Sequence, residues 1–182
     1  PNSNGAQNCI AISKTLQQKH IFITTEKALI PNQKNLALVS YKNVQKIYLK
    51  FVRINYEDKD KIFETKEKET QEDVIKRLND RKVQKSWTQE LSNKLDYNQH
   101  QSEIILPELS TGFYVLMTST NPQFSVKEDK SAVVVNPLFV TNLSYTTKQQ
   151  DNVFEIYVLD RKNSTPIKNA TVNLLKREYD YN

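Results

Sequence analysis

Short runs of β-branched, aromatic and aliphatic residues, separated by polar turns, recur along most of the chain. The clearest runs in its first three-quarters are residues 36–41, 47–56, 104–106, 113–117 and 132–135. Short apolar runs of this composition between turn-forming residues are typical of β-strands. The pattern therefore predicts a mostly β fold, with one complete sandwich over residues 19–136.

The longest run, residues 47–56, carries two conflicting alternations. Ile47, Leu49 and Phe51 share one face of a strand, whereas Val52 and Ile54 fall on the other. Side chains alternate strictly between the faces of a strand, so a shift of one residue exchanges the faces. We expect a β-bulge near residues 51–52 to reconcile the two halves.

A different pattern, with few strand formers, begins after this run. Residues 70–73 read as a helix start with an acidic first turn, and Val74, Ile75 and Leu78 follow at helical spacing. This spacing places three apolar side chains on one helix face. We therefore predict a helical insertion at about residues 57–100, with a short amphipathic helix that covers an edge or face of the sheet.

Two weaker patterns flank the predicted sandwich. Residues 1–18 are rich in Asn, Gln and Ser and predict a linker or part of a preceding element, in which Cys9 is a small residue of a first strand. Pro137 marks a plausible boundary, and apolar runs restart beyond it. Residues 137–182 carry three such runs, too few for a closed sandwich, and are predicted to be the first strands of a second domain.

One local constellation carries specific information about the fold. Leu106, Pro107, Leu109, Gly112 and Tyr114 form a leucine-proline, leucine, glycine, tyrosine series. In immunoglobulin-like sandwiches, a tyrosine near the start of a late strand bonds back to the upstream backbone. We predict that Tyr114 forms such a corner, with Gly112 free to adopt the turn and the two leucines closing the end of the core.

Four segments in order resemble macroglobulin-like domains of bacterial α2-macroglobulin proteins. Residues 36–56 are similar to the early strands of these domains, and residues 106–117 to the entry of their late strand. Residues 139–145 resemble the entry into a following domain, and residues 160–172 a hairpin in which proline, alanine and valine recur. The hairpin lacks the usual glycine, since Ser164 and Thr165 stand in its place.

The resemblance implies structural, non-catalytic domains of a bacterial protease inhibitor, located in the periplasm or at the cell surface. Their partners would be other domains of the same protein, and proteases. The thioester that such proteins can carry joins a cysteine to a glutamine three residues later. Cys9 is followed by Ile10, Ala11 and Ile12, so it does not form that group.

An alternative function is a cell-surface adhesion module that binds protein or glycan. An exposed aromatic patch including Tyr41, Tyr48, Trp87 or Tyr97 would favour it, although most of these rings are also suitable for core or cross-strand packing.

Composition excludes several other classes of function. The 182 residues carry a net charge of +5, but acidic residues are interspersed with the basic ones, so we expect no nucleic-acid partner. No run approaches the roughly 18 apolar residues that span a bilayer, so no direct membrane insertion is expected. Only two glycines occur, which disfavours phosphate-binding loops.

We also expect neither enzymatic activity nor a cofactor. His20 and His100 are far apart in the sequence and lack cysteine or carboxylate neighbours at metal-ligand spacing, so no metal site is predicted. No glycine-framed serine supports a hydrolase nucleophile.

Overall fold

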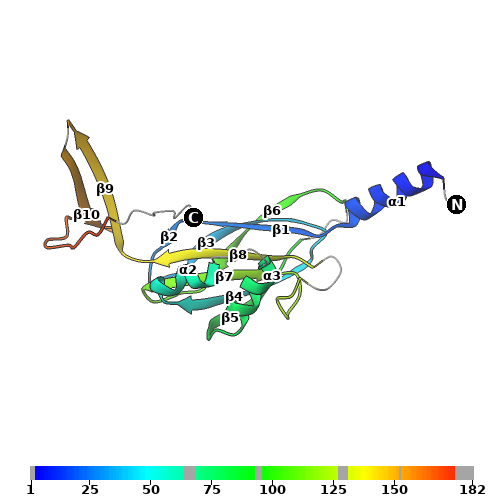
Figure 1. Cartoon of the computed structure of the whole chain (residues 1–182), viewed down its shortest axis with the longest axis horizontal. Helices are drawn as coiled ribbons and strands as arrows, with labels where there is room; N and C mark the ends of the chain where they lie inside the picture. The colour runs from blue at the N-terminus through cyan, green and yellow to red at the C-terminus, as the bar shows by residue number, and fades with distance from the viewer. Residues whose placement is uncertain (1–2, 64–68, 93–95, 127–130, 152, 175–182) are drawn as a thin grey trace, which may run out of the picture. The chain divides into compact units, whose positions relative to one another are not determined.

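A computed structural model describes residues 3–63, 69–92, 96–126, 131–151 and 153–174. The chain divides into two compact units, Pro1–Thr141 and Asn142–Asn182, each of which is described by itself (Figure 1). The remaining positions, which fall in the predicted linker, sandwich, insertion and second domain, lie outside the described residues.

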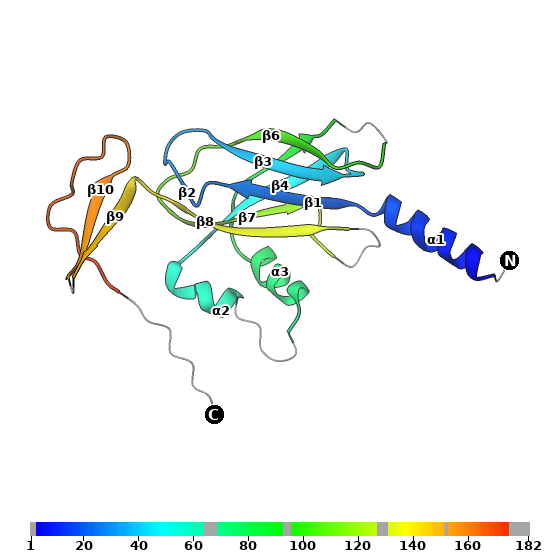
Figure 2. The same cartoon turned by 90° about the horizontal axis from the view of Figure 1, so that it is seen from above.

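The first unit contains two β-sheets. The five-stranded sheet has the order β2-β8-β7-β4-β5, and the three-stranded sheet has the order β1-β3-β6 (Figure 2). Only β2 and β8 pair in parallel; all other neighbours are antiparallel. The strands of the larger sheet are β2 (Ala28–Leu29), β4 (Lys46–Ile54), β5 (Val83–Glu90), β7 (Gly112–Ser119) and β8 (Val133–Val140). Those of the smaller sheet are β1 (His20–Thr25), β3 (Asn35–Lys42) and β6 (His100–Leu106).

Alternate residues of both sheets form the inner core. Ile47, Leu49 and Phe51 of β4 are buried together with Ile23 of β1 and Val39 of β3. Because one face of each sheet is apolar, stacking the two sheets removes both faces from water. The predicted mostly β fold is confirmed.

Helices cover the other face of the larger sheet. The 3-10 helix η1 (Tyr56–Asp58) and the short helix α2 (Lys59–Phe63) precede α3 (Gln71–Asn79). Val74, Ile75 and Leu78 of α3 are buried in a second core with Val52 and Ile54 of β4. The start of α3 is stabilised by Asp73, whose carboxylate accepts a hydrogen bond from the backbone N–H of Thr70 at 2.9 Å. The short amphipathic helix predicted to start at residues 70–73 is confirmed as Gln71–Asn79.

The sheet also contains residues that were predicted to belong to the helical insertion. The helices end at Asn79, and β5 (Val83–Glu90) pairs with β4 as an edge strand. The pairing of β4 with β5 shifts between Phe51 and Val52, as predicted, whereas β4 pairs with β7 without interruption. The irregularity therefore lies on the β5 side. Both faces of β4 carry apolar residues because both are covered, one by the smaller sheet and one by the helices. The two alternations in its sequence therefore do not require the strand to exchange its faces.

The first residues form a helix, not a strand. Helix α1 (Asn4–Gln17) begins after Ser3, whose side chain accepts the N–H of Ala6. None of its described residues is buried, and Cys9 is exposed. A strand needs a neighbour for its backbone hydrogen bonds, whereas a helix satisfies them internally. The strand predicted around Cys9 is therefore wrong.

The structure places the division of the chain after Thr141, not at Pro137. Strand β8 continues through Pro137 to Val140 and pairs with β7 along its whole length. On its other side β8 pairs only near its end, where β2 meets Phe139 and Val140. A proline is tolerated where a strand has an open side, because no ladder bond needs its missing N–H.

The second unit consists mainly of one hairpin. Strands β9 (Leu143–Gln150) and β10 (Val153–Asp160) pair antiparallel, and an isolated bridge joins Leu159 to Pro166. The third apolar run predicted as a strand covers residues 170–175, and the part of it that the structure describes, residues 170–174, forms no strand. Among all described residues, no helix has the length and hydropathy required to cross a membrane.

Candidate functional site

Tyr114 forms a polar contact at the end of the inner core. Its hydroxyl donates to the backbone carbonyl of Ser110 at 3.1 Å, and the Ser110 hydroxyl lies at the same distance. The ring is buried, as are Leu106 and Leu109 in the same core, while Pro107 is half-buried. These residues lie where the chain enters β7. Their contacts are those of residues that stabilise the fold.

Gly112 has a different role from the one predicted. It is the first residue of β7, and no glycine in the described chain has a positive φ. A Cβ at this position would lie 3.1 Å from Cε2 of Tyr114 and 3.2 Å from Nε of Arg53. Glycine therefore provides space for these two side chains and not the conformational freedom of a turn.

Removing the Tyr114 hydroxyl tests this corner. Tyr114→Phe should lower the free energy of unfolding by about 0.5–1.5 kcal/mol, because one buried hydrogen bond is lost while the ring remains. Urea unfolding followed by fluorescence measures the change. Tyr56→Phe alters a half-exposed ring and is the control. An equal effect of both substitutions would contradict a special role for the corner.

The four aromatic residues predicted for a binding patch do not share one surface. Tyr41 is buried in the inner core, and its hydroxyl donates to the carbonyl of Ser92 at 2.7 Å. Trp87 packs against that same core, whereas Tyr48 packs on the helix-covered face of the sheet. Only Tyr97 is exposed. Tertiary packing thus uses the first three rings as structural residues.

A different set of rings is exposed at one end of the larger sheet. Tyr56 and Phe139 are 46% and 43% exposed, and both contact Phe113, with ring centroids 5.6 and 4.7 Å away. They line a hollow of about 320 Å³ together with Arg53 and Glu57. This cluster gives no local signal in the sequence, because its members come from three separate segments of the chain.

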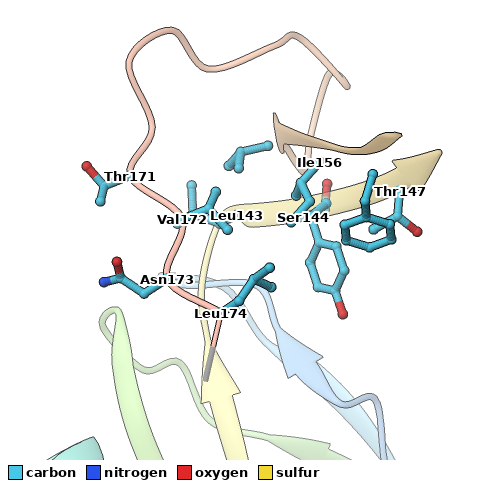
Figure 3. Close-up of a pocket in the computed structure, with 11 residues that line it drawn as sticks. Leu143, Ser144, Thr147, Ile156, Thr171, Val172, Asn173 and Leu174 are labelled. Atoms are coloured by element: carbon cyan, nitrogen blue, oxygen red, sulfur yellow. The ribbon is translucent and has the colours of Figure 1, made fainter. Parts of the chain in front are cut away.

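An open apolar face lies on the hairpin of the second unit (Figure 3). Tyr145 lies opposite Val158, and Thr147 opposite Ile156, so these side chains project from the same face. Together with residues 171–174 they line a hollow of about 620 Å³. Tyr145 is 74% exposed. An apolar sheet face of this kind is normally covered by a second layer.

The turn after β10 forms despite its missing glycine. Ser164 has a φ of 58°, in the left-handed region where glycine is favoured. The N–H of Asp160 donates to the carbonyl of Thr165, and that of Ser164 to the carbonyl of Asp160. The backbone therefore takes the hairpin geometry for which a glycine is usual.

The titratable residues in the described part of the chain include two, Lys50 and Asp96, whose pKa values are lowered by their surroundings. No group of three or more His, Cys, Asp or Glu residues there could hold a metal ion. Burial lowers the pKa of Lys50. The pKa of Asp96 is lowered to about 2, mainly because its carboxylate accepts the backbone N–H of Asn98 and secondly because of His100.

Asp96 predicts a specific pH dependence of stability. Its pKa falls from the ordinary 3.8 to about 2 on folding, so its stabilising effect is complete above pH 3.8 and is lost as the pH falls toward 2. Asp96→Asn should reduce the loss of stability over this interval. Urea unfolding midpoints of both proteins, measured above pH 3.8 and near pH 2, test this prediction. If the midpoint falls between the two pH values by the same amount in Asp96→Asn as in the unsubstituted chain, the assignment is contradicted.

Comparison with solved structures shows that the mostly β fold is similar to that of macroglobulin domains. The chain is similar to a crystal structure of native α2-macroglobulin from Escherichia coli spanning domains NIE-MG1, with a TM-score of 0.51 and 11% identity over 83% of this chain and 74% of that one. A longer structure of the same protein, spanning domains MG0-NIE-MG1, gives the same TM-score and identity; there the matched part is about half of that chain, 48%. No family model matches the sequence, and no curated protein matches it significantly. At this identity the likeness shows the fold alone.

Proposed function

We propose that this chain is a structural part of a bacterial α2-macroglobulin-like protease inhibitor. The observation that carries the proposal is the likeness of fold to Escherichia coli α2-macroglobulin over 83% of the chain. The four sequence segments that resemble macroglobulin-like domains support the same conclusion independently of the fold. In this role the chain catalyses nothing, and it acts in the periplasm or at the cell surface.

In such an inhibitor the chain would act mechanically, as a rigid link between other domains. Two features support this role: the two packed cores of the first unit and the uncovered apolar face of the hairpin. A sandwich with a core on each face of its larger sheet holds its shape under load better than a loop-rich domain. The open hairpin face of the second unit offers apolar area to a further layer of structure. Such domains would set the spacing between the parts of the inhibitor that meet the protease.

The native protein that contains this chain provides the test. It is incubated with trypsin, and hydrolysis of casein and of a small chromogenic peptide is followed in parallel. Trapping predicts that casein hydrolysis falls while peptide hydrolysis persists, since only the large substrate is excluded. Unchanged casein hydrolysis would contradict the proposal. Reading the gene on both sides of this segment should reveal further sandwich domains and would show any downstream Cys-x-x-Gln.

A second candidate function, adhesion, rests on the exposed rings of Tyr56 and Phe139, which pack against the buried ring of Phe113. Aromatic rings beside charged groups such as Arg53 and Glu57 are suitable for binding protein or glycan. A glycan array probed with the purified chain tests it. Specific binding that Tyr56→Ala abolishes would favour adhesion over protease inhibition.

A further inference from the structure

A lysine is buried beneath the helical layer of the first unit. Lys50 lies on β4 between Tyr48 and Val52, on the face of the sheet that the helices cover, and is 8% exposed. Its Nζ donates to Oδ1 of Asn79 at 2.7 Å and lies 4.2 Å from the centre of the Phe124 ring. The described contacts of Lys50 include no carboxylate.

This environment disfavours a charged amine. A buried ammonium group normally needs an anionic partner, whereas here it meets a neutral amide and an aromatic ring. Burial accordingly lowers the pKa of Lys50. Desolvated lysines of this kind are nucleophiles in other proteins, because the neutral amine carries the reactive lone pair.

The carboxamide of Asn79 is held in place. Asn79 is the last residue of α3, and its Nδ2 donates to the backbone carbonyl of Phe124 at 3.3 Å. Its Oδ1 faces Lys50. Both ends of the amide group are thus engaged, so the carbonyl carbon stays next to the amine.

The ring that covers the pair is held in an unusual backbone conformation. Phe124 has a φ of 51°, which is rare for a bulky residue, and its side chain is buried. Asn121 stabilises this loop: its Oδ1 accepts the N–H groups of Gln123 and Ser125, and its Nδ2 donates to the carbonyl of Ser125. Strain of this kind concentrates at functional sites.

We propose that Lys50 and Asn79 form an intramolecular isopeptide bond. The lone pair of Nζ attacks Cγ of Asn79, a Cγ–Nζ bond forms, and the Cγ–Nδ2 bond breaks. The amine gives up one proton, the departing nitrogen takes one, and ammonia leaves. No oxidant or cofactor is required. Close contact in a dry site supplies the main acceleration, because it replaces a bimolecular encounter. The bond would tie helix α3 to β4, and it does not depend on the proposed function.

Intact-mass measurement of the full chain tests the proposal. After incubation at neutral pH, the chain should be lighter than its sequence mass by about 17 Da, the mass of one ammonia. Tryptic digestion should yield one branched peptide that joins the segments around Lys50 and Asn79. An intact mass equal to the sequence mass would overturn the proposal.

Variants separate this bond from other losses of ammonia. Asn4 precedes Gly5, a sequence at which succinimide formation gives the same mass change, so the branched peptide is required as evidence. Asn79→Ala and Lys50→Arg should both restore the full mass, and circular dichroism checks that each variant folds. Lys85→Arg, an exposed lysine on the adjacent strand, is the matched control and should keep the loss. A digest of the unsubstituted chain that lacks the branched peptide, with the loss of ammonia located at Asn4 instead, would overturn the assignment.

Discussion

Replacing Phe51 with alanine is expected to lower the free energy of unfolding by about 3–5 kcal/mol, the largest effect of any single truncation considered for this chain. Phe51 is fully buried at the centre of β4, and its ring centroid lies 5.3 Å from that of Trp87 and 6.3 Å from that of Tyr114. Truncation removes its own buried area and leaves a cavity between the two remaining rings. Urea unfolding followed by the fluorescence of Trp87, the only tryptophan, measures the change.

Phe22→Ala is the matched control for this substitution. Phe22 lies on the outer face of the smaller sheet and is 54% exposed. Its truncation should change the unfolding free energy by less than about 1 kcal/mol, because little buried area is lost. Similar effects at the two positions would mean that the two sheets do not enclose the inner core described above.

Leu78→Ala should lower the free energy of unfolding by about 2–5 kcal/mol, because Leu78 is fully buried between α3 and the larger sheet. Leu78→Ala should still unfold in a single urea transition, shifted to lower urea. The slope of the unfolding free energy against urea concentration should be unchanged. That result is expected if the helical layer unfolds together with the sandwich.

Leu36→Ala provides the comparison for the helical layer. Leu36 is 56% exposed on β3, and its truncation should have a small effect. A separate early transition in Leu78→Ala, with the main transition unmoved, would show that the helices form an independent layer. It would contradict the view that the second core contributes to the stability of the whole unit.

The two cores also explain why the first unit tolerates so many polar segments. Strand β5 is largely exposed, and its apolar contribution to the inner core comes mainly from Trp87. Its backbone is satisfied by pairing with β4, which itself is covered on both faces. An edge strand with lysine and glutamine side chains is also a poor template for unwanted pairing with another chain.

The sequence alone determined the elements whose signals are local. Runs of β-branched residues predicted the main strands, because such side chains favour a pleated, half-buried surface. The spacing of Val74, Ile75 and Leu78, with an acidic first turn, predicted α3. Tyr114 and its upstream leucines were also recognisable from their order in the chain, since a corner of this kind spans only a few residues.

Only the tertiary structure decided the features that depend on distant partners. The polar β5 becomes a strand because β4 offers it a hydrogen-bonding edge, and Pro137 stays within β8 because that strand has an open side there. The exposed rings of Tyr56 and Phe139 meet only after folding. The sequence pattern did not single out Lys50, yet Asn79 at the end of α3 and the ring of Phe124 enclose it. Local patterns specify conformation, whereas burial and proximity arise from contacts between segments far apart in the chain.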